Sequence, residues 1–481
     1  MLNTTGKSKT IPDYQQEFSK RNIKNYLAVL FSNIGVGGFS AMLFGQWLTF
    51  VFTEYLGVSA ALIGIIVSVS IIVDCISDFV MGIVLDRFIT KWGKVKHWFF
   101  ISAIPLGLCI GLMWMIPESV PEVTKGIWAL VIYNLFCTFL TTVRMSSQAL
   151  PAIVTDSDKV RSMISYLMNI VAVLSSTALA WVMTPIVDYY GPSILAYRVV
   201  GIICGVITAV SLLLSGIFVT EQRNGEDWKQ IRENYRVKNK QEKNESIFQQ
   251  IKNLLKNRYW VFYIIINLSS GIGLFFSFGV MAYWMNLVLK DMSKLGILMT
   301  VANVPTLLGT LCFMPLTGKF DVRKIAIMTS ILSAVFGGIM WFAGAGAFNI
   351  LLFAYAAKCF VGGIQSPVAF VIIPRVIDYG EWKTGSRQEG LCNSGIGVVS
   401  KVLQSIAAAL VGIILSITGY AGGGVATPEA ISTINFLFLG VPTLSILVCG
   451  ILWIFFDLSE EKARNYREQV ESRNQGLVGN N

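Results

Sequence analysis

The sequence predicts an all-α membrane protein in which twelve transmembrane helices form two pseudo-symmetric bundles of six. Hydrophobic residues make up 54% of the 481 residues and charged residues only 14%, whereas about a quarter of the residues of a soluble protein are charged. The charged residues crowd into short segments between long apolar runs, and the longest polar segment divides these runs six and six. Helices satisfy their own backbone hydrogen bonds where lipid offers no water, which makes them the expected spanning element.

Twelve apolar runs are long enough to cross a hydrocarbon core of about 30 Å at about 1.5 Å per residue. The first run follows a polar, basic segment and is too long for the core of a signal peptide, so we expect it to remain as the first span. A tight turn is expected between the ninth and tenth runs, at Gly344–Asn349. The runs are 25–55, 58–86, 98–117, 126–150, 163–187, 195–219, 259–285, 294–316, 325–347, 348–375, 389–419 and 431–457.

The polar segments outside the runs define the expected domain organisation. Residues 25–219 and 259–457 form the two six-helix bundles, and 220–258 form a cytoplasmic central loop. Residues 1–24 and 458–481 form cytoplasmic tails, the second as a short charged helix. This division matches carriers that are built from two structural repeats.

Lysine and arginine are distributed unequally between the two sides of the predicted membrane. With the N-terminus in the cytoplasm, 31 of the 38 lie in cytoplasmic segments and 4 in outer loops. This bias predicts that both termini are cytoplasmic, and it accounts for the net charge of +10 without nucleic acid as a partner. Within the central loop, apolar residues at helical spacing between Ile247 and Leu255 predict a helix that lies on the membrane surface.

The sequence contains no pattern that indicates an enzyme. The eight cysteines lie mostly inside apolar runs without metal-ligand spacing, and a single histidine, His97, supports no histidine-based metal cluster. A nucleophile–base pair and a phosphate-binding loop are also absent from the sequence. We therefore expect a carrier that needs no cofactor.

Five ionisable residues lie deep inside the predicted spans. Such a residue at a helix centre costs about 2.5–3.5 kcal/mol on insertion scales, so five of them indicate a functional site. Counting residues from the span ends places them roughly 12–18 Å deep, where alternating-access carriers hold their ligands. They are Asp74, Asp78, Arg144, Lys358 and Lys401.

The two acids predict a cation-binding site. Asp74 and Asp78 are four residues apart and share one helical face, so their carboxylates repel each other when both are ionised. A Na⁺ between them, or a proton on one of them, removes this repulsion. Structural ion pairing with Arg144 or Lys401 is the alternative interpretation.

The three basic residues predict an anionic substrate, because Arg144, Lys358 and Lys401 outnumber the acids and a guanidinium binds a carboxylate through two parallel hydrogen bonds. Gln365 lies at a similar depth, and Asn393 shares a helical face with Lys401. We expect these five residues to contact the substrate. In the alternative, Arg144 pairs with an acid and replaces the cation, which gives an uncoupled or proton-only carrier.

Both halves carry a related charged loop after their second span. In each loop a glycine, an acid and basic residues follow the helix end. Because the same pattern occurs in both halves, we expect it to form a gate whose ion pairs form and break as the halves rock. The residues concerned are Asp86 and Arg87 in the first half and Asp321 and Arg323 in the second.

Three segments resemble signatures of the glycoside–pentoside–hexuronide:cation symporters of the major facilitator superfamily. The first is Ile377–Gly390, which contains the sequence Asp-Tyr-Gly-Glu. We group the charged residues of this segment with the gating loops. The others are Asp74–Gly82 and Ala149–Asp156, so the resemblance covers essentially the whole chain. The gating residues of the first segment are Asp378, Glu381 and Lys383.

The resemblance implies a carrier of the major facilitator fold that imports a glycoside together with Na⁺ or H⁺. It implies the inner membrane of a bacterial cell as the location and a monomer as the transport unit. Asp74 and Asp78 match the family's cation-site acids, and Lys401 matches its basic residue in the eleventh helix.

Three positions differ from the family pattern and keep the choice of sugar open. Phe79 stands where a proline usually follows the second acid, and Gly38 stands where melibiose-type members have a sugar-binding aspartate. Arg144 takes the place of an acid in the fourth helix. An acidic, hexuronide-like sugar is therefore the favoured substrate, with a non-transporting sugar sensor or a lipid flippase as the remaining alternatives.

Overall fold

The computed structural model describes residues 20–478, apart from positions 41–42, 89, 91, 156–157, 192, 222–246, 318, 386–387 and 421–425. All the elements named over these residues are helices, and their only β-type pairing is an isolated bridge between Thr90 and Gly93. The predicted all-α fold class is confirmed.

The first bundle contains six helical spans. Its first span is interrupted by two π-helical turns, the first of which is the glycine-rich η1 (Ile34–Phe39). The elements of this span are α2 (Lys20–Asn33), η1, η2 (Leu43–Trp47) and α4 (Leu48–Glu54). The other spans are α5 (Ala60–Arg87), α6 (Lys96–Leu112), α7 (Glu122–Val154), α8 (Asp158–Tyr190) and α9 (Ile194–Phe218).

The second bundle follows the short amphipathic helix α11 (Ile247–Lys256), and a charged helix, α20 (Glu460–Val478), comes after it. The first three spans are α12 (Arg258–Tyr283) with η3 (Trp284–Leu289), η4 (Met292–Lys294) with α13 (Leu295–Thr317), and α14 (Val322–Ala343). The next are η5 (Ala345–Ala347) with α15 (Phe348–Gln365) and α16 (Val368–Thr384), then α17 (Glu389–Ile417). The last consists of α18 (Pro428–Asn435), η6 (Phe436–Gly440) and α19 (Val441–Phe455).

The helices coincide with the predicted apolar runs. Eleven helical spans of the described chain are long and apolar enough to cross a membrane, and α6 is a shorter apolar helix in the third run. Gly344 adopts a positive φ of 56°, which glycine tolerates well, at the expected turn between the ninth and tenth runs. The tenth run is longer than predicted, because helix continues through Thr384.

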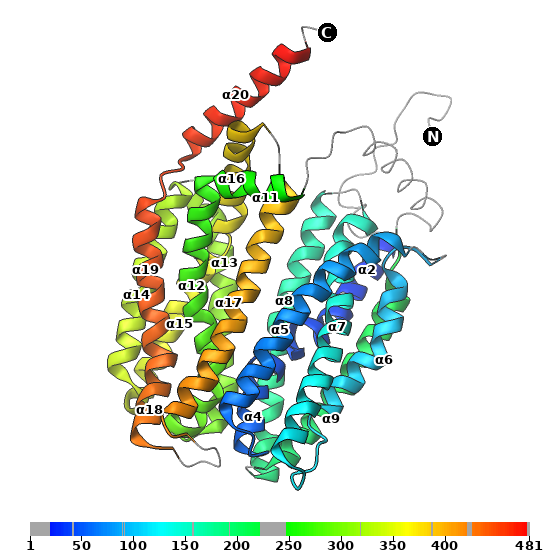
Figure 1. Ribbon diagram of the computed structural model, residues 1–481, viewed down its shortest axis with the longest axis vertical. Helices are drawn as coiled ribbons and strands as arrows, with labels where there is room; N and C mark the ends of the chain where they lie inside the picture. Colours follow the sequence, from blue (N-terminus) through cyan, green and yellow to red (C-terminus); the bar gives the residue numbers. More distant parts are fainter. Residues whose placement is uncertain are drawn as a thin grey trace.

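The two bundles stand side by side, with α11, α20 and the start of α2 on one side of the molecule (Figure 1). We call this the terminus side and the opposite one the far side. At the far side α5 and α17 cross so closely that a Cβ on Gly412 would lie 2.2 Å from the Ala60 carbonyl oxygen. A side chain at this position would therefore push α5 and α17 apart at their crossing.

Further contacts join the bundles on the far side. Tyr283 donates to Thr53 at 3.1 Å and Asn286 donates to Glu54 at 2.9 Å, both linking the second bundle to the end of α4. Nearer the middle of the helices, Ser68 and Ser405 lie within hydrogen-bond distance at 2.7 Å. These contacts hold the far side closed.

Charged residues on the terminus side make contacts inside the second bundle. Arg323 donates to the carbonyl oxygens at the end of α19, at 2.5 and 3.3 Å, and Lys383 donates to the carbonyl oxygen of Lys256 at 2.9 Å. Asp321 caps α14 and lies 3.7 Å from Arg375, which also pairs with Glu460 of α20 at 3.0 Å. The described contacts between the bundles therefore lie at mid-helix and on the far side, the arrangement of a carrier open toward the terminus side.

The other expected gating residues are placed less completely. Asp378 and Glu381 lie on α16, and both make interactions. Asp86 and Arg87 end α5, but their side chains fall outside the described residues. The gating role of all these charges stays a prediction.

Candidate functional site

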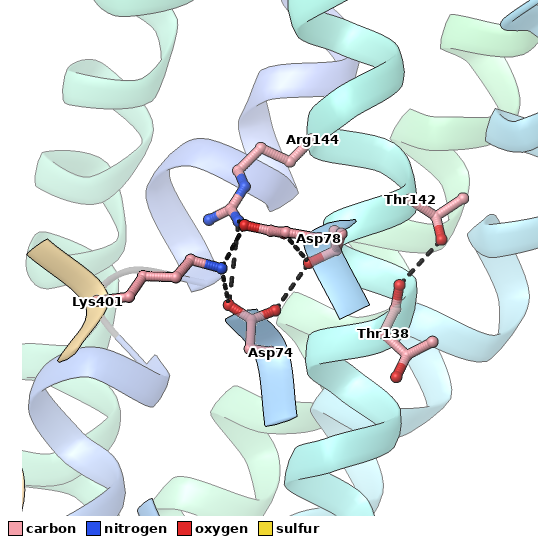
Figure 2. Close-up of polar contacts among 7 residues, drawn as sticks. Asp74, Asp78, Thr138, Thr142, Arg144 and Lys401 are labelled. Carbon is pink, nitrogen blue, oxygen red and sulfur yellow. Dashed lines mark hydrogen bonds and ion pairs between the residues drawn. The ribbon is translucent and has the colours of Figure 1, made fainter. Parts of the chain in front are cut away.

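Four of the five buried charges meet between α5, α7 and α17 (Figure 2). Lys401 of α17 contacts both acids, with its Nζ 2.6 Å from Asp74 Oδ2 and in direct contact with Asp78 Oδ2. Arg144 of α7 donates through one amino group to both oxygens of Asp78, at 3.0 and 3.2 Å, and this group lies 4.0 Å from Asp74. The cluster joins the two bundles, because Lys401 belongs to the second and the other three residues to the first.

Thr141 completes this charge cluster and was missed from the sequence. Its hydroxyl lies 2.8 Å from Asp74 Oδ1 and 2.9 Å from Asp78 Oδ1. A hydroxyl carries a single proton, so Thr141 donates to one carboxylate at a time. The available signal is its position three residues before Arg144, which places both side chains on one face of α7.

The charge cluster is balanced, with two carboxylates and two cationic side chains. The acids and Lys401 are mostly buried, with 15%, 24% and 17% of the Asp74, Asp78 and Lys401 side chains exposed, whereas Arg144 is 37% exposed. Every carboxylate oxygen has a partner, so internal ion pairing describes the acids in this state. A cation can therefore bind to these acids in two ways. It displaces one of their present partners, or it binds after a further negative charge has entered the site.

Lys358 does not belong to the charge cluster. It lies half-buried on α15, and no ion pair of Lys358 occurs among the described residues. The expected convergence of all five charges is therefore limited to four. Asn393, also expected at the substrate, is exposed two helical turns from Lys401, toward the terminus side.

Arg144 faces a polar cavity of about 390 Å³ in the first bundle, which we call the N-half cavity. Its amide side chains, Asn33, Gln148 and Asn169, come from the first, fourth and fifth spans. The Nε and second amino group of Arg144 have no partner among the described residues. The guanidinium thus links the charge cluster to this cavity and retains unused donors.

A second cavity of about 570 Å³, the C-half cavity, lies in the other bundle. Gln365 lines it, as predicted for a substrate-binding residue, together with Asn267 and Ser400. Ser400 directly precedes Lys401, so the charge cluster lies between the two cavities. A volume of this size is typical of small-molecule sites.

The family model for the MFS/sugar transport proteins matches residues 30–460. The chain belongs to this family. The isoprimeverose transporter of Lactiplantibacillus pentosus is 26% identical over 452 residues, which cover 91% of this chain and 90% of that protein. The glucuronide carrier protein homolog of Escherichia coli (strain K12) is 23% identical over 429 residues, which cover 88% and 90%.

Among solved structures, the xylose transporter XylE from Escherichia coli, in a partially occluded inward open conformation, matches with a TM-score of 0.60 at 13% identity. The match covers 92% of this chain and 99% of that one. This likeness supports the major facilitator fold. As a member of the MFS/sugar transport proteins, the chain is a polytopic sugar carrier and not an enzyme, as the sequence predicts.

Proposed function

We propose that this carrier imports an acidic, hexuronide-like sugar by symport with one cation, Na⁺ or H⁺. The observation that carries the proposal is the position of Arg144, which holds Asp78 with one amino group and lines the N-half cavity. A carboxylate in this cavity can accept a charge-assisted hydrogen bond from the free Nε–H or from the second amino group. The glucuronide carrier homolog among the relatives is consistent with this substrate class.

Coupling follows from the balance of the charge cluster. When a substrate carboxylate engages Arg144, the guanidinium neutralises the substrate and Asp78 loses part of its partner. The two acids with Lys401 then carry a net negative charge, which favours binding of a cation at Asp78. Carboxylate and hydroxyl oxygens, here including Thr141, are hard ligands that suit Na⁺, and a carboxylate equally accepts a proton.

Uptake occurs through alternation between the present state and one open on the far side. The excess of lysine and arginine on the terminus side supports a cytoplasmic location for both termini, so the present state faces inward. The monomer contains both bundles and both cavities, which supports a monomeric transport unit. Lys358 stays a candidate contact for the substrate, since a half-buried lysine inside a span is costly without function.

Transport by purified protein in liposomes tests the proposal. A glucuronide and its matched neutral glucoside are offered with a Na⁺ gradient, with a proton gradient or with neither. We expect uptake of the glucuronide driven by one gradient, and a loss of about 10- to 150-fold in Arg144→Gln, because a hydrogen bond to a charged group contributes about 1.5–3 kcal/mol. Arg144→Lys, the matched control, keeps the charge on a single nitrogen, which cannot hold Asp78 and the substrate with separate groups, so its effect should be intermediate.

Uptake of the glucoside alone would refute the acidic substrate. Glucuronide uptake that equilibrates without accumulating under either gradient would show that Arg144 permanently replaces the cation and that the carrier is uncoupled. Accumulation under the proton gradient only would assign the cation as H⁺.

A further inference from the structure

The two cavities occupy corresponding places in the two bundles. The N-half cavity is lined by the first, fourth and fifth spans of its bundle, and the C-half cavity by the first, fourth, fifth and sixth of its own. Each has an asparagine on the first span, Asn33 or Asn267, and a glutamine on the fourth, Gln148 or Gln365. The structure thus contains two related polar cavities, one on either side of the charge cluster.

The linings differ in charge and in aromatic content. The N-half cavity has the Arg144 guanidinium and no aromatic ring in its lining, whereas the C-half cavity has Tyr263, Phe275 and Trp453 and no charged side chain. Aromatic and apolar walls with a few placed polar groups are typical of small-molecule sites, and a lining without a charged side chain offers no partner to an ionised group. The C-half cavity therefore suits a neutral ring that carries hydroxyl groups.

Gln365 offers the C-half cavity an amide oxygen without a partner among the described residues. Trp453 is 3% exposed and its Nε1 is shielded, so this residue contributes an aromatic wall and not a hydrogen-bond donor. Gln365 donates through its Nε2 to Ser330 at 3.0 Å, and its Oε1 has no donor in the described part of the chain. A hydroxyl of a ligand in this cavity can donate to the Gln365 Oε1 while the sugar ring packs against the aromatic walls.

We propose that the C-half cavity binds a neutral second sugar ring of the substrate, linked to the acidic ring held at Arg144. The inference rests on the proposed function, because the acidic ring defines the other end of the ligand. The charge cluster supports this bridging position, since Arg144 lines one cavity and Lys401 follows Ser400 of the other. The substrate class is then an acidic glycoside of at least two rings.

Calorimetric binding to purified full-length carrier tests this assignment with three ligands. They are glucuronic acid, a disaccharide of glucuronic acid linked to a neutral hexose, and the matched neutral disaccharide. Trp453→Phe shortens the aromatic wall of the cavity, and Gln365→Met removes the amide. Ile446→Leu, in the same lining, is the control.

We expect Trp453→Phe and Gln365→Met each to weaken binding of the acidic disaccharide about tenfold, while glucuronic acid changes less than twofold. Arg144→Gln should weaken both acidic ligands. Equal effects of the C-half variants on both acids, or no effect on either, would refute the second-ring site. If only the neutral disaccharide binds and Trp453→Phe weakens it, the acidic substrate fails while the C-half site stands.

Discussion

Lys401 joins the two bundles through an ion pair at mid-helix, and its removal should shift the carrier away from the present state. The side chains of Lys401 and Asp74 are 17% and 15% exposed and their charged atoms are 2.6 Å apart. Breaking a fully buried ion pair costs about 3–5 kcal/mol, and a surface pair is worth about 0–1 kcal/mol. For this partly hydrated pair we expect about 1.5–3 kcal/mol.

The substitution Lys401→Met keeps the length of the side chain and removes the charge. Because the pair stabilises the far-side-closed arrangement, its loss should raise the ratio of far-side-open to closed molecules about 10- to 150-fold, at about 1.4 kcal/mol per factor of ten. Spin labels at the exposed far-side residues Glu118 and Glu429, one in each bundle, report this change as a longer distance in double electron–electron resonance.

Lys358→Met is the matched control, because this lysine also lies inside a span but has no ion pair in the described chain. Its distance distribution should equal that of the unaltered protein at the same pH and Na⁺ concentration. If Lys401→Met and Lys358→Met gave the same distribution, the ion pair would not stabilise the closed far side and the reasoning would be wrong.

Three further outcomes are expected. Gly363→Ala should lower the thermal unfolding temperature by several degrees in detergent, because its Cβ would lie 2.1 Å from the Thr306 carbonyl oxygen, and such overpacking costs about 1–3 kcal/mol. Gly362→Ala, with open space around its Cβ, should not. Tyr466→Ala should expose α20 to proteolysis more than Glu460→Gln, because Tyr466 packs on two aromatic rings of α16 whereas Glu460 is 75% exposed. Uptake of a monoanionic sugar should be unaffected by an imposed potassium diffusion potential, and a clear response would contradict a balanced cluster.

The depth of the charged residues could be predicted from the sequence, because a helix advances about 1.5 Å per residue and its ends are marked by polar segments. This placed Asp74, Asp78, Arg144 and Lys401 near one level, where the structure brings them together. The side toward which Lys358 points from its helix was not predictable. It depends on how this helix is rotated against its neighbours. A single chain without its tertiary packing carries no record of that rotation.

Thr141, which was missed, and Asn393, which lies away from the charge cluster, have equally physical reasons for their places. Thr141 does not stand out by its own chemistry in an apolar run, because a threonine hydroxyl can bond to its own helix backbone and costs little there, so only its spacing from Arg144 could have indicated it. Asn393 shares a face with Lys401, but eight residues along a helix correspond to about 12 Å, which separates it from the charge cluster. A shared face therefore predicts a shared direction and not a shared site.

The charge balance also explains why Arg144 and a coupling cation can coexist. With both acids ionised, the empty charge cluster is neutral, so the closed intermediate through which the empty carrier returns buries no net charge, which would be costly in the membrane. An acidic substrate adds one negative charge, and the same intermediate then becomes favourable only when one cation accompanies it. A neutral sugar would instead leave the cluster balanced without a cation and would be carried uncoupled. In this arrangement a cation binds because the substrate brings a negative charge to Arg144. Unpaired acids are not the reason, since Asp74 and Asp78 already have partners.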